Sequence, residues 1–281
     1  MSCPGDAGSS PLVSVIDLAG LPLAKLSRHA VVDHVFTRIE RGEGGWIVTP
    51  NLDYARRYVA DPAMRRLFAG ASLIVADGVP LLWAARLQGT PLPDRVAGSD
   101  LVWLLAERAA REGRSLYLLG GNPGVGEQAR QRLIDRSPTL RVVGVSSPRV
   151  SAQPSESEIA SIRAEIERSR PDIVYVGLGA PKEERLIAAL RPTFPGSWWI
   201  GVGVSLSFIA GDVVRAPRWV QRMGLEWLHR LVQEPGRLGR RYLVDGLPFA
   251  IRLLTGSLWR RWTTRRELAA ARAPGSRNPD A

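Results

Sequence analysis

The sequence predicts an α/β protein with a Rossmann-like, mostly parallel sheet, helices on both faces of that sheet, and a basic helical C-terminal appendage. Short apolar runs alternate with helical patterns through residues 1–214, which is typical of βαβ units. From Arg215 onward this alternation stops, and arginine and tryptophan interleave with apolar residues. We therefore expect a core over residues 1–214, an appendage over 215–267 and a disordered tail over 268–281.

Seven apolar runs are expected to form the strands of the sheet. They are residues 12–16, 46–49, 72–76, 115–119, 141–145, 172–177 and 197–202. Parallel strands that are buried on both faces are apolar throughout, as are "LYLLG" and "IVYVG". Asp61, which a proline follows, and Ser99-Asp100 are typical helix starts. Ser155 and Glu158 have the spacing of a capping box.

The composition is that of a globular protein, with 45% hydrophobic and 23% charged residues in a chain of 281. The single cysteine, Cys3, excludes a disulfide framework and a cysteine metal site. His29 and His34 have a spacing that fits no zinc-binding helix, so we expect no metal site. We find no signal peptide and no apolar run of about 20 residues, so we expect a cytoplasmic protein.

Most of the net charge of +11 lies in the C-terminal region. Residues 215–272 hold thirteen arginines against four acidic residues, together with four of the nine tryptophans. Within this region, Leu247–Leu258 is mostly apolar and is bracketed by Arg240-Arg241 and Arg260-Arg261. Basic residues that flank an apolar face favour a helix bound peripherally to an anionic membrane, here the inner face of the cytoplasmic membrane.

Two other interpretations of this basic region are a helix that packs its apolar side on the core and a surface that binds nucleic-acid phosphates. We expect no nucleic-acid partner, because the chain has no recognised nucleic-acid motif. The sequence is compatible with a homo-oligomer. It also predicts that the helical region is interrupted at Pro235-Gly236 and at 246–248.

The stretch "LIVADGVPLLWAARL", residues 73–87, consists of a predicted strand and a predicted helix with Asp77 at their junction. In an open α/β sheet, ligands bind in the crevice at the carboxyl ends of the strands. Asp77 is therefore a candidate catalytic residue. The alternative is that it only caps the helix, since aspartate is a favoured N-cap.

Polar residues follow other strands as well. Thr49 and Asn51 end the strand in "WIVTPNLDYA" and would point into the same crevice, although an asparagine here is also typical of a capped turn. Arg95 in "DRVAGSD" follows a proline-containing loop. Its guanidinium group is suited to bidentate pairing with a phosphate, or it is a surface arginine.

A glycine-rich turn follows the strand in "LYLLGGNPGVGEQAR", residues 116–130. The backbone of Gly121, Asn122 and Gly124 would cradle a phosphate at the start of the next helix, or would form a tight structural turn. The turn is not a P-loop, because Glu127-Gln128 stands where Lys-Ser/Thr is required.

Two further strand ends carry polar or glycine residues. In "VGLGAPKEER", Lys182 and Glu183 lie in the first turn of a predicted helix, where the helix dipole alone favours acids. In "WIGVGVSLSF", Gly203 permits close approach of a ligand to the backbone. Together these signals follow five successive strands and predict one substrate-binding crevice.

Seven motifs occur in one order along the chain: "TPN", "ADG" before "WAARL", "RVAGSDL", "LLGG", "VGLGAPK", "GVG" and "RAPRWVQRMGLEWLHRLVQEPGRLGRRYL". With this spacing, residues 12–254 resemble the WecG/TagA/CpsF family of bacterial glycosyltransferases. The resemblance implies transfer of a hexose or N-acetylhexosamine, with inversion, from a UDP-sugar to a polyprenyl-diphosphate-linked saccharide for a cell-surface polysaccharide. It implies no cofactor, no essential metal, and an appendage that docks on the membrane.

The resemblance also implies roles for individual residues. The aspartate matching Asp77 is the general base, Thr49 and Asn51 match residues that line the active site, and Arg95 matches an implicated arginine. Arginines of the appendage would complete the site; they are Arg215, Arg237, Arg240 and Arg241. The chain departs from the family pattern in having Glu183-Glu184 where Gln-Glu is common, and Ser207 where an aspartate is often found.

Two alternatives to a glycosyltransferase are considered. A nucleotide-dependent oxidoreductase is disfavoured, because no Rossmann fingerprint follows the first strand. The second alternative is a non-catalytic α/β module that binds a membrane or nucleic acid. Thermal stabilisation by UDP, by NAD or by neither separates the three interpretations.

Overall fold

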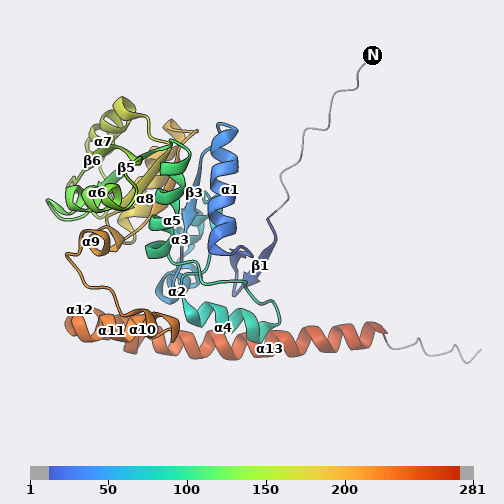
Figure 1. The fold of residues 1–281 in the computed structure, drawn as a ribbon. Helices are drawn as coiled ribbons and strands as arrows, with labels where there is room; N and C mark the ends of the chain where they lie inside the picture. Colours follow the sequence, from blue (N-terminus) through green and yellow to red (C-terminus); the bar gives the residue numbers. More distant parts are fainter. Residues whose placement is uncertain (1–12, 273–281) are drawn as a thin grey trace, which may run out of the picture.

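A computed structural model describes residues 13–272 of the chain (Figure 1). It does not describe the side chains of Arg218, Arg222, Arg237 and residues 268–272. Residue 12 of the first expected strand and residues 273–281 of the expected tail lie outside the described residues.

Six of the predicted strands form one parallel sheet in the order β4-β3-β8-β7-β5-β6. Their bounds are β3 Gly45–Val48, β4 Leu73–Ile74, β5 Ser115–Gly120, β6 Arg141–Ser146, β7 Ile173–Gly177 and β8 Trp198–Gly201. The strands β5 and β7 are buried along their whole length, as expected of apolar parallel strands with a helical layer on either side. The predicted Rossmann-like α/β fold class is therefore confirmed.

Helices cover both faces of this sheet and pack on two separate apolar clusters. One face is covered by α1 (Arg28–Glu40), α5 (Gly98–Arg111), α6 (Val125–Arg136) and α9 (Ser205–Ala210). The other face is covered by α2 (Leu52–Ala60), α3 (Pro62–Phe68), α7 (Glu156–Ser169) and α8 (Lys182–Leu190), after which comes a 3-10 turn, η1 (Arg191–Thr193). The helix α4 (Val79–Gln88) shares the apolar cluster of this face but lies at the carboxyl edge of the sheet, next to the C-terminal part of the chain (Figure 1).

The first expected strand, at 12–16, was wrongly assigned to the parallel sheet, and the observed strand begins later, at Val15. Instead β1 (Val15–Leu18) pairs antiparallel with β2 (Leu21–Ala24) in a separate two-stranded sheet. Ala19 and Gly20 join the two strands with φ angles of 54° and 85°. A two-residue turn of this kind allows only antiparallel pairing, because a parallel pair needs a long crossover connection.

The helix starts agree with the sequence in two of three places. Ser155 and Glu158 form the predicted capping box at the start of α7. Asp61 caps α3 by accepting from the backbone N–H of Ala63 at 2.8 Å. The third helix, α5, begins at Gly98 without a side-chain cap, so Ser99-Asp100 lies inside its first turn.

The appendage is a chain of helices along the carboxyl edge of the sheet (Figure 1). It consists of α10 (Arg218–Arg222), α11 (Glu226–Gln233), α12 (Pro235–Gly239), the π-helix η2 (Arg240–Gly246) and α13 (Leu247–Arg272). The expected interruption at 246–248 is absent, because η2 leads directly into α13. The wider hydrogen-bonding pattern of a π-helix accommodates Pro248, which has no N–H to donate.

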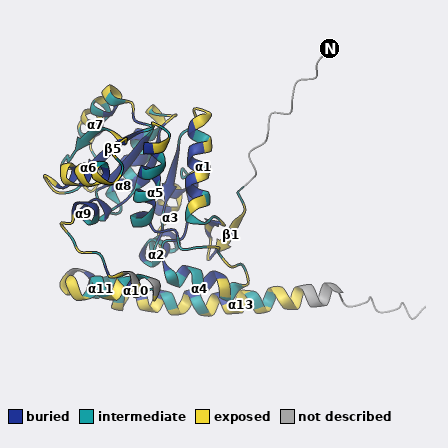
Figure 2. Ribbon diagram, viewed as in Figure 1, coloured by how far each residue is buried: buried dark blue, intermediate teal, exposed yellow. Residues whose placement is uncertain are grey.

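The long helix α13 fixes the appendage to the core. It packs along α4, and its side chains Phe249, Leu253 and Ser257 are buried. The opposite side of the helix is largely exposed (Figure 2). Because α13 continues to Arg272, it passes residue 268, where the sequence predicted a disordered tail. Within the described residues, no helix has the length and apolar character needed to cross a membrane.

Candidate active site

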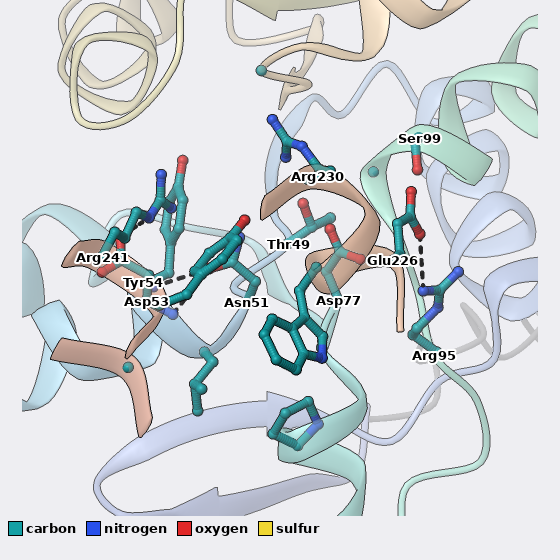
Figure 3. A pocket seen from close by; sticks show the side chains of 18 of the residues that line it. Thr49, Asn51, Asp53, Tyr54, Asp77, Arg95, Ser99, Glu226, Arg230 and Arg241 are labelled. Carbon is teal, nitrogen blue, oxygen red and sulfur yellow. Dashed lines mark hydrogen bonds and ion pairs between the residues drawn. The ribbon is translucent and has the colours of Figure 1, made fainter. Parts of the chain in front are cut away.

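A cavity of about 500 Å³ lies at the carboxyl ends of β3, β4 and β8, between the core and the appendage. Its polar lining comes from both parts of the chain (Figure 3). The core contributes Thr49, Asn51, Asp77, Arg95, Glu183 and Gly203, and the appendage contributes Glu226, Arg230 and Arg241. The strand-end residues Thr49, Asn51, Asp77 and Gly203 therefore share one crevice, as their positions predicted.

Asp77 follows β4 and reaches the cavity with its carboxyl group. Its backbone N–H donates to the carbonyl of Pro50 at 3.0 Å, and the backbone N–H of Gly98 donates to the carboxyl group. Burial raises the pKa of Asp77 to about 7, against the opposing charge of Arg95. The negative charges of Glu226 and Asp100 raise this pKa further.

The capping interpretation of Asp77 is wrong. The N-cap of α4 is Gly78, and no side chain donates to or accepts from the free backbone groups at that position. The carboxyl group of Asp77 therefore does not cap α4, and it lines the cavity.

Asn51 has both of the roles that the sequence left open. Its Oδ1 caps α2 by accepting from the backbone N–H groups of Asp53 at 3.0 Å and Tyr54 at 3.2 Å. The residue also lines the cavity, as does Thr49. A Cβ atom at position 98 would lie 3.1 Å from Oγ1 of Thr49, so the glycine at 98 allows α5 to begin against this side chain.

Four charged side chains join the appendage to the core beside Asp77, and we call them the Arg95–Glu226 network. Arg95 lies 3.3 Å from Glu226 and 3.7 Å from Asp100. Arg215 lies 2.7 Å from Asp100 and 3.0 Å from Glu226. All four side chains are between 17% and 21% exposed, so water screens these pairs less than it screens surface pairs. Arg215 does not line the cavity and holds the appendage in place instead.

Glu183 lines the cavity, and its buried carboxyl group is also held by backbone groups of the protein. Its contact with substrate stays a prediction. Its Oε2 accepts from the backbone N–H groups of Leu178, Gly179 and Gly203, at 3.0 to 3.3 Å. The hydroxyl of Tyr54 donates to Glu184 at 2.6 Å and lies 3.2 Å from Glu183. Burial, and then the neighbouring carboxyl of Glu184, raises the pKa of Glu183. The side chain of Glu183 ties the loops after β7 and β8 to each other.

Several predicted binding residues lie away from this cavity. Those not in its lining are Gly121, Asn122, Gly124, Lys182 and Arg240. The glycine-rich turn follows β5, which β7 separates from β8 in the sheet. Lys182 donates from Nζ to the carbonyl of Val150 at 3.2 Å, and Arg240 is exposed. The side chain of Arg237 lies outside the described residues.

Of the appendage arginines predicted to complete the site, Arg241 lines the cavity, and it is paired with an acid of the core. Its guanidinium Nε lies 3.0 Å from Oδ2 of Asp53, a residue only 4% exposed at the start of α2. This pair forms a second link between appendage and core, on the far side of the cavity from Arg95 in Figure 3.

Sequence reasoning missed Glu226 and Arg230, because it followed strand ends and both residues lie on α11. They are four positions apart, a spacing that places two side chains on the same face of a helix. The guanidinium carbon of Arg230 lies 6.0 Å from the centre of the Phe208 ring. Among the described residues, Arg230 has no acidic partner.

The described residues contain no group of three or more His, Cys, Asp and Glu side chains arranged to hold a metal ion. His34 packs edge-on against Trp198 with ring centres 5.9 Å apart, so it is part of the packing.

The fold and the site together define an α/β protein with a ligand-sized cavity at the carboxyl edge of a parallel sheet, lined by a buried acid with a raised pKa and by arginines. The model of the Glycosyl transferase WecG/TagA/CpsF family matches residues 16–264. The match spans most of the chain, so the protein belongs to this family of glycosyltransferases. The predicted family is thereby confirmed, and the oxidoreductase and the non-catalytic module are not retained.

Two curated relatives are named N-acetylglucosaminyldiphosphoundecaprenol N-acetyl-beta-D-mannosaminyltransferase. The protein of Bacillus spizizenii is 31% identical over 204 residues, which are 73% of this chain and 77% of the relative. The protein of Bacillus subtilis is 29% identical over 202 residues, which are 72% of this chain and 77% of the relative.

The raised pKa of Asp77 predicts a pH-dependent gain in stability for Asp77→Asn. The pKa is 3.8 in the unfolded chain and about 7 in the folded protein. Between pH 3.8 and about pH 7, Asp77 is ionised in the unfolded chain but still protonated in the folded protein. The carboxyl group of Asp77 therefore lowers the unfolding free energy increasingly as the pH rises to 7. An amide has no such effect. The gain in unfolding free energy, from urea denaturation, should be about 2 kcal/mol larger at pH 8 than at pH 5.

Asp212→Asn is the matched control, because the side chain of Asp212 is exposed in the loop before the appendage. We expect this variant to change the unfolding free energy equally at the two pH values. An equal effect of Asp77→Asn at pH 5 and pH 8 would contradict the raised pKa.

Proposed function

We propose that the protein is an inverting glycosyltransferase that moves an N-acetylhexosamine from a UDP-sugar to a polyprenyl-diphosphate-linked saccharide of a cell-envelope polysaccharide. The observation that carries this proposal is the carboxyl group of Asp77, with a pKa of about 7, facing a cavity that contains arginines. By their names, the two relatives transfer N-acetylmannosamine to N-acetylglucosamine on diphosphoundecaprenol. We infer the same class of donor and acceptor for this chain.

Asp77 is the general base of the proposed reaction. Its carboxylate takes the proton of an acceptor hydroxyl as that oxygen attacks the anomeric carbon of the donor sugar. The new carbon–oxygen bond forms on the face opposite UDP, the bond to UDP breaks, and the configuration inverts. A base with a pKa near the working pH combines a populated ionised form with useful basicity.

The departing UDP carries negative charge, which arginines of the cavity would stabilise. Arg230 is best suited to this role, because it lines the cavity and has no acidic partner among the described residues. Arg95 also lines the cavity, but it is shared between Glu226 and Asp100. With arginines supplying the positive charge, we propose that the transfer needs no metal ion and no cofactor.

The direct test is a panel of UDP-sugars incubated with N-acetylglucosamine linked through a diphosphate to a short polyprenol, with product masses recorded. We expect transfer of one N-acetylhexosamine residue, with UDP-N-acetylmannosamine as the preferred donor and no loss of rate in EDTA. The absence of transfer from every UDP-sugar would contradict the proposed function.

Asp77→Asn should lower turnover by about 10² to 10⁴, the usual cost of losing a general base. The affinity for UDP, measured by calorimetry, should stay near that of the wild type. In the wild type, kcat/KM should rise with pH, reach half of its maximum near pH 7 and level off above about pH 8, because only the ionised carboxyl accepts a proton. Turnover of Asp77→Asn within tenfold of the wild type would contradict the assignment of the base.

We further propose that α13 lies on an anionic membrane, at its cytoplasmic face. Leu258, Trp259 and Trp262 are 49%, 66% and 45% exposed, and Arg265 and Arg266 follow them on the same helix. Exposed apolar side chains beside arginines are typical of a helix held in the membrane interface. Such a location brings the enzyme to an acceptor that is anchored in the bilayer.

Replacing Arg265 and Arg266 with glutamate should lower partitioning to phosphatidylglycerol vesicles at least tenfold, because each basic residue near the surface contributes about 1 kcal/mol. Co-sedimentation measures this change, and binding of the wild type should weaken with added salt.

The control variant carries glutamate at Arg111 and Arg168, which gives the same change in net charge. These residues are near the ends of α5 and α7, at the sheet edge away from the appendage. We expect this variant to bind vesicles like the wild type. Equal losses in the two variants would contradict a membrane-binding role that is specific to α13.

A further inference from the structure

The cavity extends beyond its polar residues into an apolar part between α4 and α13, which we call the α4–α13 groove. Pro80 and Trp83 of α4 form one wall. Leu247, Ile251 and Leu254 of α13 form the other. The three α13 positions follow at spacings of four and three residues, so they lie on one face of the helix.

This groove leaves large apolar side chains in contact with water. Trp83 is 55% exposed, Leu247 is 54% exposed and Ile251 is 56% exposed. None of the described segments covers them. Because water contact with apolar surface is unfavourable in proportion to its area, an apolar occupant of the groove would be stabilised.

The groove is continuous with the polar part of the cavity. This part contains Asp77 and three arginines, of which Arg95 and Arg241 are paired with acids and Arg230 has no acidic partner among the described residues. A ligand that is complementary to both parts has an anionic head next to an apolar chain. A chain without an anionic group would leave Arg230 unmatched, and a free nucleotide would leave the groove empty.

The proposed acceptor has this composition, and its covalent structure fixes the order of its parts. The diphosphate joins the saccharide to the prenyl chain. When the hydroxyl of the saccharide reaches Asp77, the diphosphate lies one saccharide unit away from it, and the first prenyl units must lie immediately beyond the diphosphate. The α4–α13 groove offers exposed apolar side chains in the same cavity as Asp77.

We infer that the α4–α13 groove binds the first isoprenyl units of the acceptor lipid, with Trp83 and Ile251 as the main contacts. This inference rests on the proposed function, because it takes the acceptor from there. It adds a lipid-recognition site made of side chains that do not take part in the chemistry.

The outer end of the groove faces the proposed membrane surface. Leu247, Ile251, Leu258 and Trp262 follow one another at spacings of four, seven and four residues, which places them on one face of α13. All four side chains of this face are between 45% and 56% exposed. A prenyl chain that leaves the groove therefore continues along the face that we propose lies on the bilayer.

Calorimetry with farnesyl diphosphate, below its micellar concentration and at saturating UDP, tests the inference. The wild type should bind farnesyl diphosphate at least tenfold more tightly than inorganic diphosphate. Trp83→Ala and Ile251→Ala should each lower the affinity for farnesyl diphosphate about tenfold and leave the affinity for inorganic diphosphate unchanged. Both side chains are more than half exposed, so their truncation should not disturb folding.

Trp219→Ala is the matched control. Trp219 is 63% exposed on α10 and does not line the cavity, so its removal should leave the affinity for farnesyl diphosphate unchanged. Equal binding of the two diphosphates to the wild type would overturn the inference, and so would equal losses in Trp83→Ala and Trp219→Ala. Binding of lysophosphatidylglycerol with the same dependence on Trp83 would also overturn it, and would assign the groove to bilayer lipids.

This measurement needs no turnover, so it separates the inference from the proposed reaction. If farnesyl diphosphate binds in a Trp83-dependent way but no sugar is transferred to the lipid-linked acceptor, the proposed reaction is wrong and the groove remains a prenyl-binding site. If transfer occurs but its rate and KM are independent of Trp83 and of prenyl chain length, the groove inference is wrong and the reaction stands.

Discussion

The Arg95–Glu226 network is the interaction on which the catalytic cavity depends. In the core it involves Arg95 in the loop before α5 and Asp100 on α5. In the appendage it involves Arg215 before α10 and Glu226 on α11. The network thereby holds the appendage against the carboxyl edge of the sheet. Partly buried ion pairs are strongly destabilised when one partner is lost, because the remaining charge has no compensation. Each of the four side chains has two opposite charges within reach, so the network favours the closed arrangement of appendage and core.

The same network also influences the pKa of Asp77. Burial is the largest cause of the raised pKa, and the appendage contributes to that burial because its residues close one side of the cavity that Asp77 lines. Within the network, the positive charge of Arg95 lowers the pKa, whereas the negative charges of Glu226 and Asp100 raise it. An appendage that moved away from the core would hydrate the carboxyl group and remove Glu226. Docking of the appendage and the raised pKa of Asp77 are therefore coupled.

The sequence predicted the parts of this protein that depend on local patterns. Buried parallel strands are apolar throughout, so six of the strands were located, and the residues after β3 and β4 led directly to Thr49, Asn51 and Asp77. The first strand was assigned to the parallel sheet and its partner β2 was missed, because a short apolar run looks the same in either kind of sheet when its turn is not recognised. Proline and glycine at 246–248 predicted a break that the π-helix avoids.

Contacts between segments that are distant in the sequence could not be predicted from local patterns. Arg95 and Glu226 are separated by most of the core sequence, and only the docking of the appendage brings them together. The role of Glu183 was missed for a related reason. A glutamate in the first turn of a helix is explained by the helix dipole alone, and nothing in the local pattern indicates that its carboxyl group binds two other loops.

The uninterrupted course of α13 fixes its direction relative to the core. With 26 residues and a rise of 1.5 Å per residue, the helix is about 39 Å long. One end forms a wall of the groove, and farther along Arg260 is paired with Asp17 of the hairpin, so the core fixes the helix at both places. A helix held at two places cannot swing independently of the core. In the proposed location of α13 on a membrane, the contact between helix and bilayer would therefore also set the orientation of the core, and the cavity would keep one distance from the membrane surface.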